Sequence, residues 1–149
     1  MNLKFSITFS DIQDFSQVFT NLDSSEIKKL EKYLVQQKYP AKIPICTEGQ
    51  PGDGMFLVNQ GSVKVMKKIP GGSKQIGKLD KGDVFGEISF LTNSAFTATV
   101  YSETECEVTC LPREKFEAIE KKDIKLAYKI VLALTKVLSE KLLTVNQLL

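Results

Sequence analysis

The 149-residue sequence contains no histidine and no tryptophan, and its only arginine is Arg113. The absence of histidine excludes the imidazole general base, the Ser-His-Asp triad and the most common protein ligand of zinc and haem. With 20 basic and 18 acidic residues, the net charge is +2, which favours neither nucleic acid nor a membrane surface as a partner. We therefore expect a protein that is not an enzyme and whose partners follow from specific sites.

Cysteine is scarce. Cys46, Cys106 and Cys110 are an odd number of thiols, and the N-terminus has neither a basic leader nor a long apolar run followed by a cleavage site. We expect reduced thiols and a cytoplasmic location. On a regular strand Cys106 and Cys110 share one face about 13 Å apart, which is too far for a disulfide or a shared metal. We predict buried thiols, with no metal and no tightly bound cofactor.

Long apolar runs are also missing. The most apolar stretch, Ile130 to Leu134, is bounded by Lys129 and Lys136 and is far shorter than the roughly twenty residues of a membrane span. Hydrophobic residues make up 42% of the chain and charged residues 26%, as in ordinary globular proteins. A chain of this length buries one core without disulfides, so we expect a single domain over residues 1–149.

The strongest helix breakers are confined to the middle of the chain. All nine glycines lie between positions 49 and 86, and all five prolines lie between positions 40 and 112. This distribution predicts three segments, namely N-terminal helices over 1–39, a β-rich part over 40–111 and C-terminal helices over 112–149.

Two short helices are expected in the N-terminal segment. Ile12, Phe15 and Phe19 recur at helical spacing. Asp23, followed by Glu26 three residues later, is typical of a capping box that opens a second helix.

The middle segment reads as short strands separated by turns. Alternating apolar and polar residues predict strands over Ile43–Cys46, Met55–Asn59, Ser62–Met66, Gln75–Leu79, Thr97–Tyr101 and Glu105–Leu111. Pro70, Gly71 and Gly72 predict a hairpin turn. Many short strands at this spacing favour a sandwich or a jelly roll.

The C-terminal helix has too many apolar residues for one buried stripe. From Ile124 onward, 16 of 26 residues are apolar. We expect one face on the domain itself and a seam that pairs with a second copy in a homodimer, although a helix buried wholly in its own domain is an alternative. The predicted seam comprises Ala127, Val131, Leu134, Leu138, Val145 and Leu148.

Two runs carry a family resemblance. The run from Tyr39 to Val65, YPAKIPICTEGQPGDGMFLVNQGSVKV, and the run from Phe85 to Val100, FGEISFLTNSAFTATV, resemble the cyclic nucleotide-binding domains of the catabolite activator protein and of the regulatory subunits of cAMP-dependent protein kinase. The resemblance covers nearly the whole chain. It implies an eight-stranded β-roll, which is a double-stranded β-helix or jelly roll, with N-terminal helices, a long C-terminal helix and a phosphate-binding cassette over 86–97.

The resemblance also implies a ligand-binding site for cAMP or cGMP in the cassette. In this pattern Gly86 lets the backbone approach the ligand, and Glu87 accepts the ribose 2′-hydroxyl. The backbone N–H groups at Ile88 and Ser89 face the phosphate, and Thr97 adds a hydroxyl and an N–H.

One position departs from the family pattern. Phe96 stands where such domains carry an arginine that grips the cyclic phosphate with a bidentate, charge-assisted pair. Arg113 lies at the separate position after the last strand, and a lysine does not reproduce the fork of an arginine. We expect weak binding of cAMP and cGMP, with Phe96 either closing the pocket or facing an apolar ligand.

Three functions remain open at this point. The first is a regulatory domain that signals through a ligand-dependent shift of its C-terminal helix. The second is a ligand-independent dimerisation or protein-interaction module, and the third is a sensor of a different small ligand. Because the long helix is followed by no recognition helix in this sequence, we expect no DNA-binding domain.

Overall fold

The structure is a computed structural model that describes the backbone of residues 3–5 and 16–147 and the side chains of residues 16–144. Its strands form two antiparallel sheets. The five-stranded sheet has the order β1-β2-β9-β4-β7, and the four-stranded sheet has the order β3-β8-β5-β6. The strands are β1 (Leu3–Phe5), β2 (Val35–Tyr39), β3 (Pro44–Cys46), β4 (Gly54–Gln60), β5 (Val63–Ile69), β6 (Gly72–Leu79), β7 (Val84–Phe85), β8 (Thr99–Ser102) and β9 (Cys106–Pro112).

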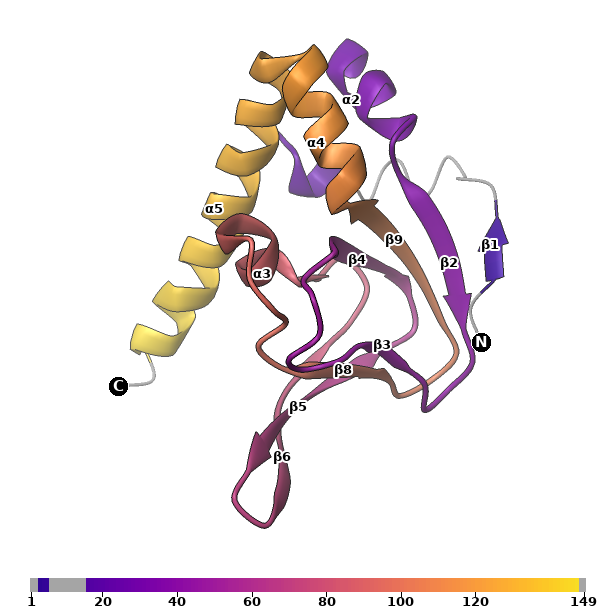
Figure 1. The fold of residues 1–149 in the computed structure, drawn as a ribbon, viewed down its shortest axis with the longest axis vertical. Coiled ribbons are helices and arrows are strands. Elements are labelled where there is room, and N and C mark those ends of the chain that lie inside the picture. The colour runs from indigo at the N-terminus through magenta and orange to yellow at the C-terminus, as the bar shows by residue number, and fades with distance from the viewer. Residues whose placement is uncertain (1–2, 6–15, 148–149) are drawn as a thin grey trace.

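The helices are grouped around one side of this β-roll. Figure 1 shows α2 and α4 at one end of the molecule, with α5 running from there past α3 toward the C-terminus. They are α2 (Ser24–Glu31), α3 (Glu87–Thr92), α4 (Arg113–Lys122) and α5 (Ile124–Gln147). The mainly β architecture with flanking helices and a long C-terminal helix confirms the predicted fold class.

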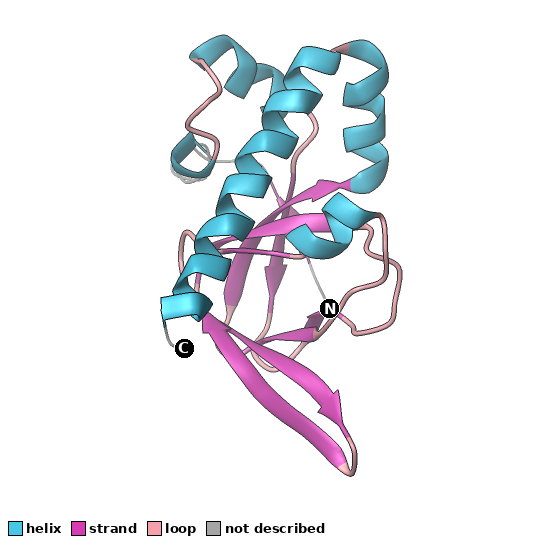
Figure 2. Ribbon diagram, turned by 90° about the vertical axis from the view of Figure 1, so that its left-hand side faces the viewer, coloured by secondary structure: helices cyan, strands magenta, loops and turns pink. Residues whose placement is uncertain are grey.

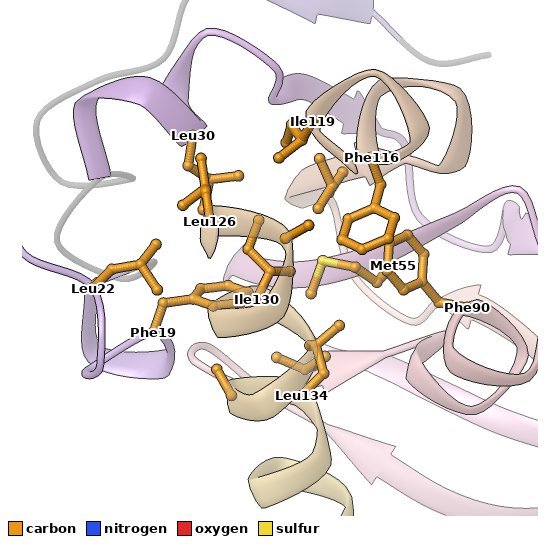
Figure 3. Close-up of a cluster of buried hydrophobic side chains, with 14 of the residues drawn as sticks. Phe19, Leu22, Leu30, Met55, Phe90, Phe116, Ile119, Leu126, Ile130 and Leu134 are labelled. Carbon is orange, nitrogen blue, oxygen red and sulfur yellow. The ribbon is translucent and has the colours of Figure 1, made fainter. Parts of the chain in front are cut away.

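Two apolar cores lie on opposite faces of the five-stranded sheet. On β4, Phe56 and Val58 face the interior of the roll, whereas Met55 and Leu57 face the helices. This alternation follows from the two-residue period of a strand. Figure 3 shows the helix-side core, in which Met55 lies among side chains from α4 and α5. Phe19 and Leu30 lie at the opposite end of this cluster from Met55.

The capping box that opens α2 is confirmed. The Asp23 carboxylate accepts from the Glu26 backbone N–H at 2.8 Å, and the Glu26 carboxylate accepts from the Asp23 N–H at 3.0 Å. Glu26 also accepts a hydrogen bond from Lys129 of α5 at 2.8 Å. These bonds, the one from Lys129 first, hold the pKa of Glu26 below its ordinary value.

The N-terminal segment is not purely helical, which corrects the expectation for 1–39. Residues 35–39 form β2, which pairs with β9 from Val35↔Cys110 to Tyr39↔Cys106, and β1 adds to its other edge. The alternation of apolar and polar residues that indicates a strand is missing from β2, because Gln36, Gln37 and Lys38 are three consecutive polar residues. Residues 16–18 are helical, and Ile12 and Phe15 of the first expected helix lie outside the described residues.

A long hairpin extends the four-stranded sheet. β5 and β6 pair from Val63↔Leu79 to Ile69↔Gly72, with a register shift at Val65/Met66. Gly71 has a φ of +84° in the turn, as predicted for Pro70–Gly72. Figure 2 shows this hairpin projecting beyond the rest of the molecule, with β6 as the outer strand.

Helix α5 has two apolar faces, as expected, but the predicted seam is wrong at two of its positions. Ala127 and Leu134 are 2% and 0% exposed and belong to the helix-side core. The two residues are seven positions apart and so lie on one side of the helix, and that side packs against the domain itself. Val145 and Leu148 lie beyond the described side chains. The exposed apolar face is instead formed by Ile124, Tyr128, Val131, Leu132, Leu142 and Leu143.

Within the described ranges 3–5 and 16–147, no helix has the length and hydropathy needed to cross a membrane.

Candidate functional site

A glycine turn places the cassette helix. β7 pairs with β4 through Phe56↔Phe85, and the chain then turns at Gly86 into the six-residue helix α3. Gly86 has a φ of +81°, and a Cβ atom there would lie 2.9 Å from the Gly54 carbonyl oxygen. Both the backbone conformation and the close approach to β4 therefore require glycine.

The six predicted site residues line one cavity of about 350 Å³. Gly86, Glu87, Ile88 and Ser89 come from the cassette helix and its turn, and Phe96 and Thr97 come from the segment that leads into β8. The volume lies at the lower end of the range for small-molecule sites, about 300–1,000 Å³. The other lining residues, which sequence reasoning did not identify, are Cys46, Val65, Ile76, Gly77, Leu79, Phe85, Ala98, Val100 and Lys141.

Glu87 is buried and paired with a lysine from the far end of the chain. Its side chain is 5% exposed, and its Oε1 lies 2.6 Å from the Nζ of Lys141 on α5. Lys141 also donates to the Val84 carbonyl oxygen at 2.6 Å. Glu87 is therefore a buried, paired carboxylate and not a solvated surface acid. Fifty-four residues separate the two partners, so no local pattern reveals the pair.

Phe96 faces the interior of the roll. It is 7% exposed, and its ring centroid lies 6.3 Å from that of Phe56, which stacks on Phe85 at 4.9 Å. Its backbone is also fixed, because its N–H donates to the Gln50 carbonyl and its carbonyl accepts from the Gly49 N–H, both at 2.9 Å. The wall of the cavity at position 96 is therefore aromatic and apolar.

A second lysine holds the end of the cassette. Lys67 of β5 donates to the Thr97 carbonyl oxygen at 2.6 Å and lies 3.0 Å from the Glu48 carboxylate. The hydrogen bond from Lys67 is the main cause that lowers the pKa of Glu48. Thr97 itself is exposed, and its backbone carbonyl, not its hydroxyl, is the group that Lys67 binds.

The single arginine serves the cassette from outside the cavity. Arg113 donates through one terminal nitrogen to the carbonyl oxygens of Ser89, at 3.3 Å, and Phe90, and through Nε to that of Gly52 at 3.3 Å. Its guanidinium also lies 4.9 Å from the centroid of the Phe90 ring. The prediction that Arg113 does not take the place of the missing arginine agrees with these contacts.

The three cysteines are buried and form no disulfide. Cys106 and Cys110 lie on the same β9 strand facing the roll interior. Burial raises the pKa of Cys46 to about 12, so this thiol at the cavity wall stays protonated near neutral pH. Among the described residues, no group of three His, Cys, Asp or Glu side chains is placed to hold a metal ion.

The cavity combines an apolar wall with one charge-balanced polar end. Phe96, Val65, Leu79 and Val100 supply the wall, and the Glu87–Lys141 pair supplies the polar end. By its lining, the cavity is chemically complementary to a molecule with an apolar body and polar groups at one end. A larger hollow of about 560 Å³ beside Arg113 contains none of the predicted residues.

The sequence matches a known protein family over more than half of its length. The model described as "Cyclic nucleotide-binding domain" matches residues 36–123. The cAMP-dependent protein kinase regulatory subunit of Neurospora crassa is 33% identical over 102 residues, which are 68% of this chain and 26% of that protein. The cGMP-dependent protein kinase egl-4 of Caenorhabditis elegans is 34% identical over 102 residues, which are 66% of this chain and 13% of that protein. The chain thus spans a minor part of these relatives.

Solved structures share the fold. A cyclic nucleotide-binding domain from Methylobacillus flagellatus superimposes with a TM-score of 0.86 over 95% of this chain and 83% of that chain, at 22% identity. A regulatory subunit of a cAMP-independent protein kinase A from Trypanosoma brucei gives a TM-score of 0.70 at 26% identity, over 87% of this chain and 45% of that chain. The latter is a mutant with three substitutions, one of them threonine to arginine, bound to cAMP in its A site.

Proposed function

Because this chain belongs to the cyclic nucleotide-binding domain family, we propose that it is a regulatory domain that senses a small ligand in the cavity between α3 and the roll. One observation carries the proposal. Six residues assigned to the ligand from the sequence line a single cavity, and the wall of that cavity is completed by Lys141 of the C-terminal helix. A ligand in this cavity therefore contacts both the cassette and α5, which suits a domain that transmits binding to a neighbour.

The proposal includes weak binding of cAMP and cGMP. The arginine that would pair with the cyclic phosphate is replaced by Phe96, which packs on Phe56, and Arg113 is engaged with backbone carbonyls. Removing one partner of a desolvated charge pair costs about 2–5 kcal/mol, or roughly thirtyfold to several thousandfold in affinity. A dissociation constant in the micromolar range thereby becomes about millimolar.

The signalling step is a population shift of the C-terminal helix. Helix α5 contributes Lys141 to the cavity and buries its opposite end in the helix-side core. A ligand that binds one arrangement of α3 and α5 better than another shifts the molecule toward that arrangement. The exposed apolar face of α5 supports a second copy as the partner that reads the shift.

A sensor of a different small ligand is the second candidate, and the apolar wall around Phe96 favours it. Val65, Leu79 and Val100 surround a volume that a less charged molecule fills better than a cyclic phosphate does. The ligand-independent interaction module, the third candidate, is supported by the exposed face of α5 and by the closed Glu87–Lys141 pair.

Calorimetric titration with cAMP and cGMP tests the proposal. We compare the unmodified chain with Phe96→Arg, with Phe96→Lys, which adds charge without a fork, and with Phe96→Leu, which only removes the ring. For the unmodified chain and for Phe96→Leu, we expect dissociation constants of about 1 mM or weaker. For Phe96→Arg, we expect an affinity at least about thirtyfold higher. Phe96→Lys should fall between them.

Each variant is first checked for a native circular dichroism spectrum and a single cooperative thermal transition. Sub-micromolar binding of either nucleotide to the unmodified chain would overturn the proposal that Phe96 weakens the site. If no variant binds either nucleotide while all stay folded, the cavity is not a cyclic nucleotide site, and the interaction module becomes the better explanation.

A further inference from the structure

The contact between Glu87 and Lys141 is a direct polar link between the cassette and the C-terminal helix. Lys141 Nζ lies 2.6 Å from Glu87 Oε1 and 2.6 Å from the Val84 carbonyl oxygen, so its ammonium bridges the first residue of α3 and strand β7. Among the described residues that line the cavity, Lys141 is the one cation. The carboxylate assigned to the ligand is therefore already bound to the protein itself.

Burial makes this pair more than a surface ion pair. The Glu87 side chain is 5% exposed, whereas that of Lys141 is 40% exposed. A carboxylate at this depth requires a partner, because an unpaired buried charge is strongly unfavourable. Lys141 leaves Glu87 only when another hydrogen-bond donor replaces it.

Lys141 also has a special place along α5. The first half of the helix is anchored in the helix-side core by Leu126, Ile130 and Leu134, which are at most 2% exposed. Between residues 138 and 144 no side chain is fully buried. The contacts of Lys141 with Glu87 and Val84 are thus the polar anchor of this otherwise weakly held part of the helix.

We propose that the Glu87–Lys141 pair is a latch, in which Lys141 competes with the ligand for Glu87 and its release frees the end of α5. This inference rests on the proposed function, since it assumes that the ligand donates a hydroxyl to Glu87. In the proposed bound state the ligand hydroxyl takes the place at Glu87 Oε1 that the Lys141 ammonium holds without ligand. Binding is therefore coupled to the departure of Lys141, and Lys141 both lowers the affinity and transmits the binding event.

Amide hydrogen exchange without ligand tests the latch itself. We expect Lys141→Gln to speed exchange over residues 138–147 several-fold, while Lys136→Gln, an exposed lysine on the same helix, leaves it unchanged. Glu87→Gln should have the same effect as Lys141→Gln, and the double variant should add little, because the two residues act through one contact. Lys141→Arg should retain the protection. Unchanged exchange in Lys141→Gln would overturn the latch.

Titration in the Phe96→Arg background tests the competition. We expect Lys141→Gln to strengthen cAMP binding about five- to tenfold, within the usual range of coupling between sites. The analogue 2′-deoxy-cAMP lacks the hydroxyl that competes for Glu87, so Lys141→Gln should not strengthen its binding. An equal gain for both nucleotides, or a gain for neither, would overturn the competition.

The two proposals fail in different ways. If Phe96→Arg binds no cyclic nucleotide, the proposed ligand class fails, and the exchange experiment still decides whether the latch exists. If Phe96→Arg binds tightly but Lys141→Gln changes neither exchange nor affinity, the latch fails and the ligand class stands.

Discussion

Three cations from three different elements hold the cassette, and each side chain does so in a different way. Lys67 of β5 binds the Thr97 carbonyl oxygen, Arg113 of α4 binds carbonyl oxygens of α3, and Lys141 of α5 binds the Glu87 carboxylate. All three basic side chains are bonded to protein groups. Their positive charge therefore stabilises the cassette and is not available to a phosphate without breaking one of these contacts. At the residue scale, the function of this site depends on which of these partnerships a ligand can replace.

The Glu26–Lys129 contact makes the stability of the helical end depend on pH. The folded-state pKa of Glu26 lies below its ordinary value of 4.5, so the stabilisation is present above pH 4.5 and is lost as the pH falls through the lowered pKa. We expect Glu26→Gln, which keeps the capping-box oxygen, to lower the melting temperature at about pH 7 and to lie closer to the unmodified chain at about pH 3.

Thermal unfolding followed by circular dichroism at several pH values measures this effect. Glu120→Gln, on the exposed side of α4, is the matched control and should show no such dependence. A difference between Glu26→Gln and the unmodified chain that is the same at both pH values would show that the charge of Glu26 is not the cause.

The sequence predicted residues that line one cavity, but it did not predict their partners. Gly86, Glu87 and Phe96 occupy positions fixed by a local pattern, and all three line the cavity as expected. Lys141 and Lys67 are ordinary lysines in the sequence, and only the folding of α5 and β5 against the cassette brings them there. A contact over 54 residues carries no local signature.

At the scale of elements, α5 is buried on one side and apolar on the other. Leu134 is fully buried in the helix-side core, whereas Leu132, two residues earlier, is 47% exposed. The excess of apolar residues predicted both faces, but it did not predict their phase, because positions three and four apart fit either side of a helix. The burial of Ala127 and Leu134 settles which side faces the sheet.

Light scattering tests whether the exposed face pairs with a second copy. We expect a dimer for the unmodified chain and a monomer with an unchanged melting temperature for Leu132→Lys, since a lysine there disrupts an apolar interface without touching the core. Glu120→Lys on α4 is the control and should stay dimeric. A Leu132→Lys protein with the same molar mass as the unmodified chain would place any self-association elsewhere.

Strands β2 and β7 show why some elements escaped prediction. β2 presents polar side chains on both faces, and Gln36 is buried beside Thr109, which donates to it at 2.8 Å. β7 has only two residues, Val84 and Phe85. Neither contains an alternation long enough to recognise, and both exist because a neighbouring strand supplies the hydrogen bonds.

At the scale of the whole molecule, β4 is the wall that the two cores share. Its residues from Gly54 to Asn59 are all buried, alternately toward the roll and toward the helices. Damage on either face of this strand therefore affects both the ligand cavity and the packing of α5. We infer that the roll and the helices unfold together.

Urea unfolding of Leu57→Ala tests this cooperativity. Leu57 is fully buried, so we expect a loss of about 2–5 kcal/mol in the free energy of unfolding, in a single transition seen alike by far-UV circular dichroism and by tyrosine fluorescence. Ile69→Ala, the control, removes three carbons from a side chain on β5 that is 45% exposed and should cost much less. Two separate transitions for Leu57→Ala would show that the cores are independent.

The projecting hairpin has a consequence for solubility. β6 is the outermost strand of its sheet, and such an edge invites another chain to add a strand and begin a fibril-like aggregate. The irregular register at Val65/Met66 bends this edge, and Lys74 and Lys78 place charge along it. The exposed apolar residue Ile76 lies between these lysines. The two charges therefore disfavour the pairing of another chain with this edge at its most apolar position.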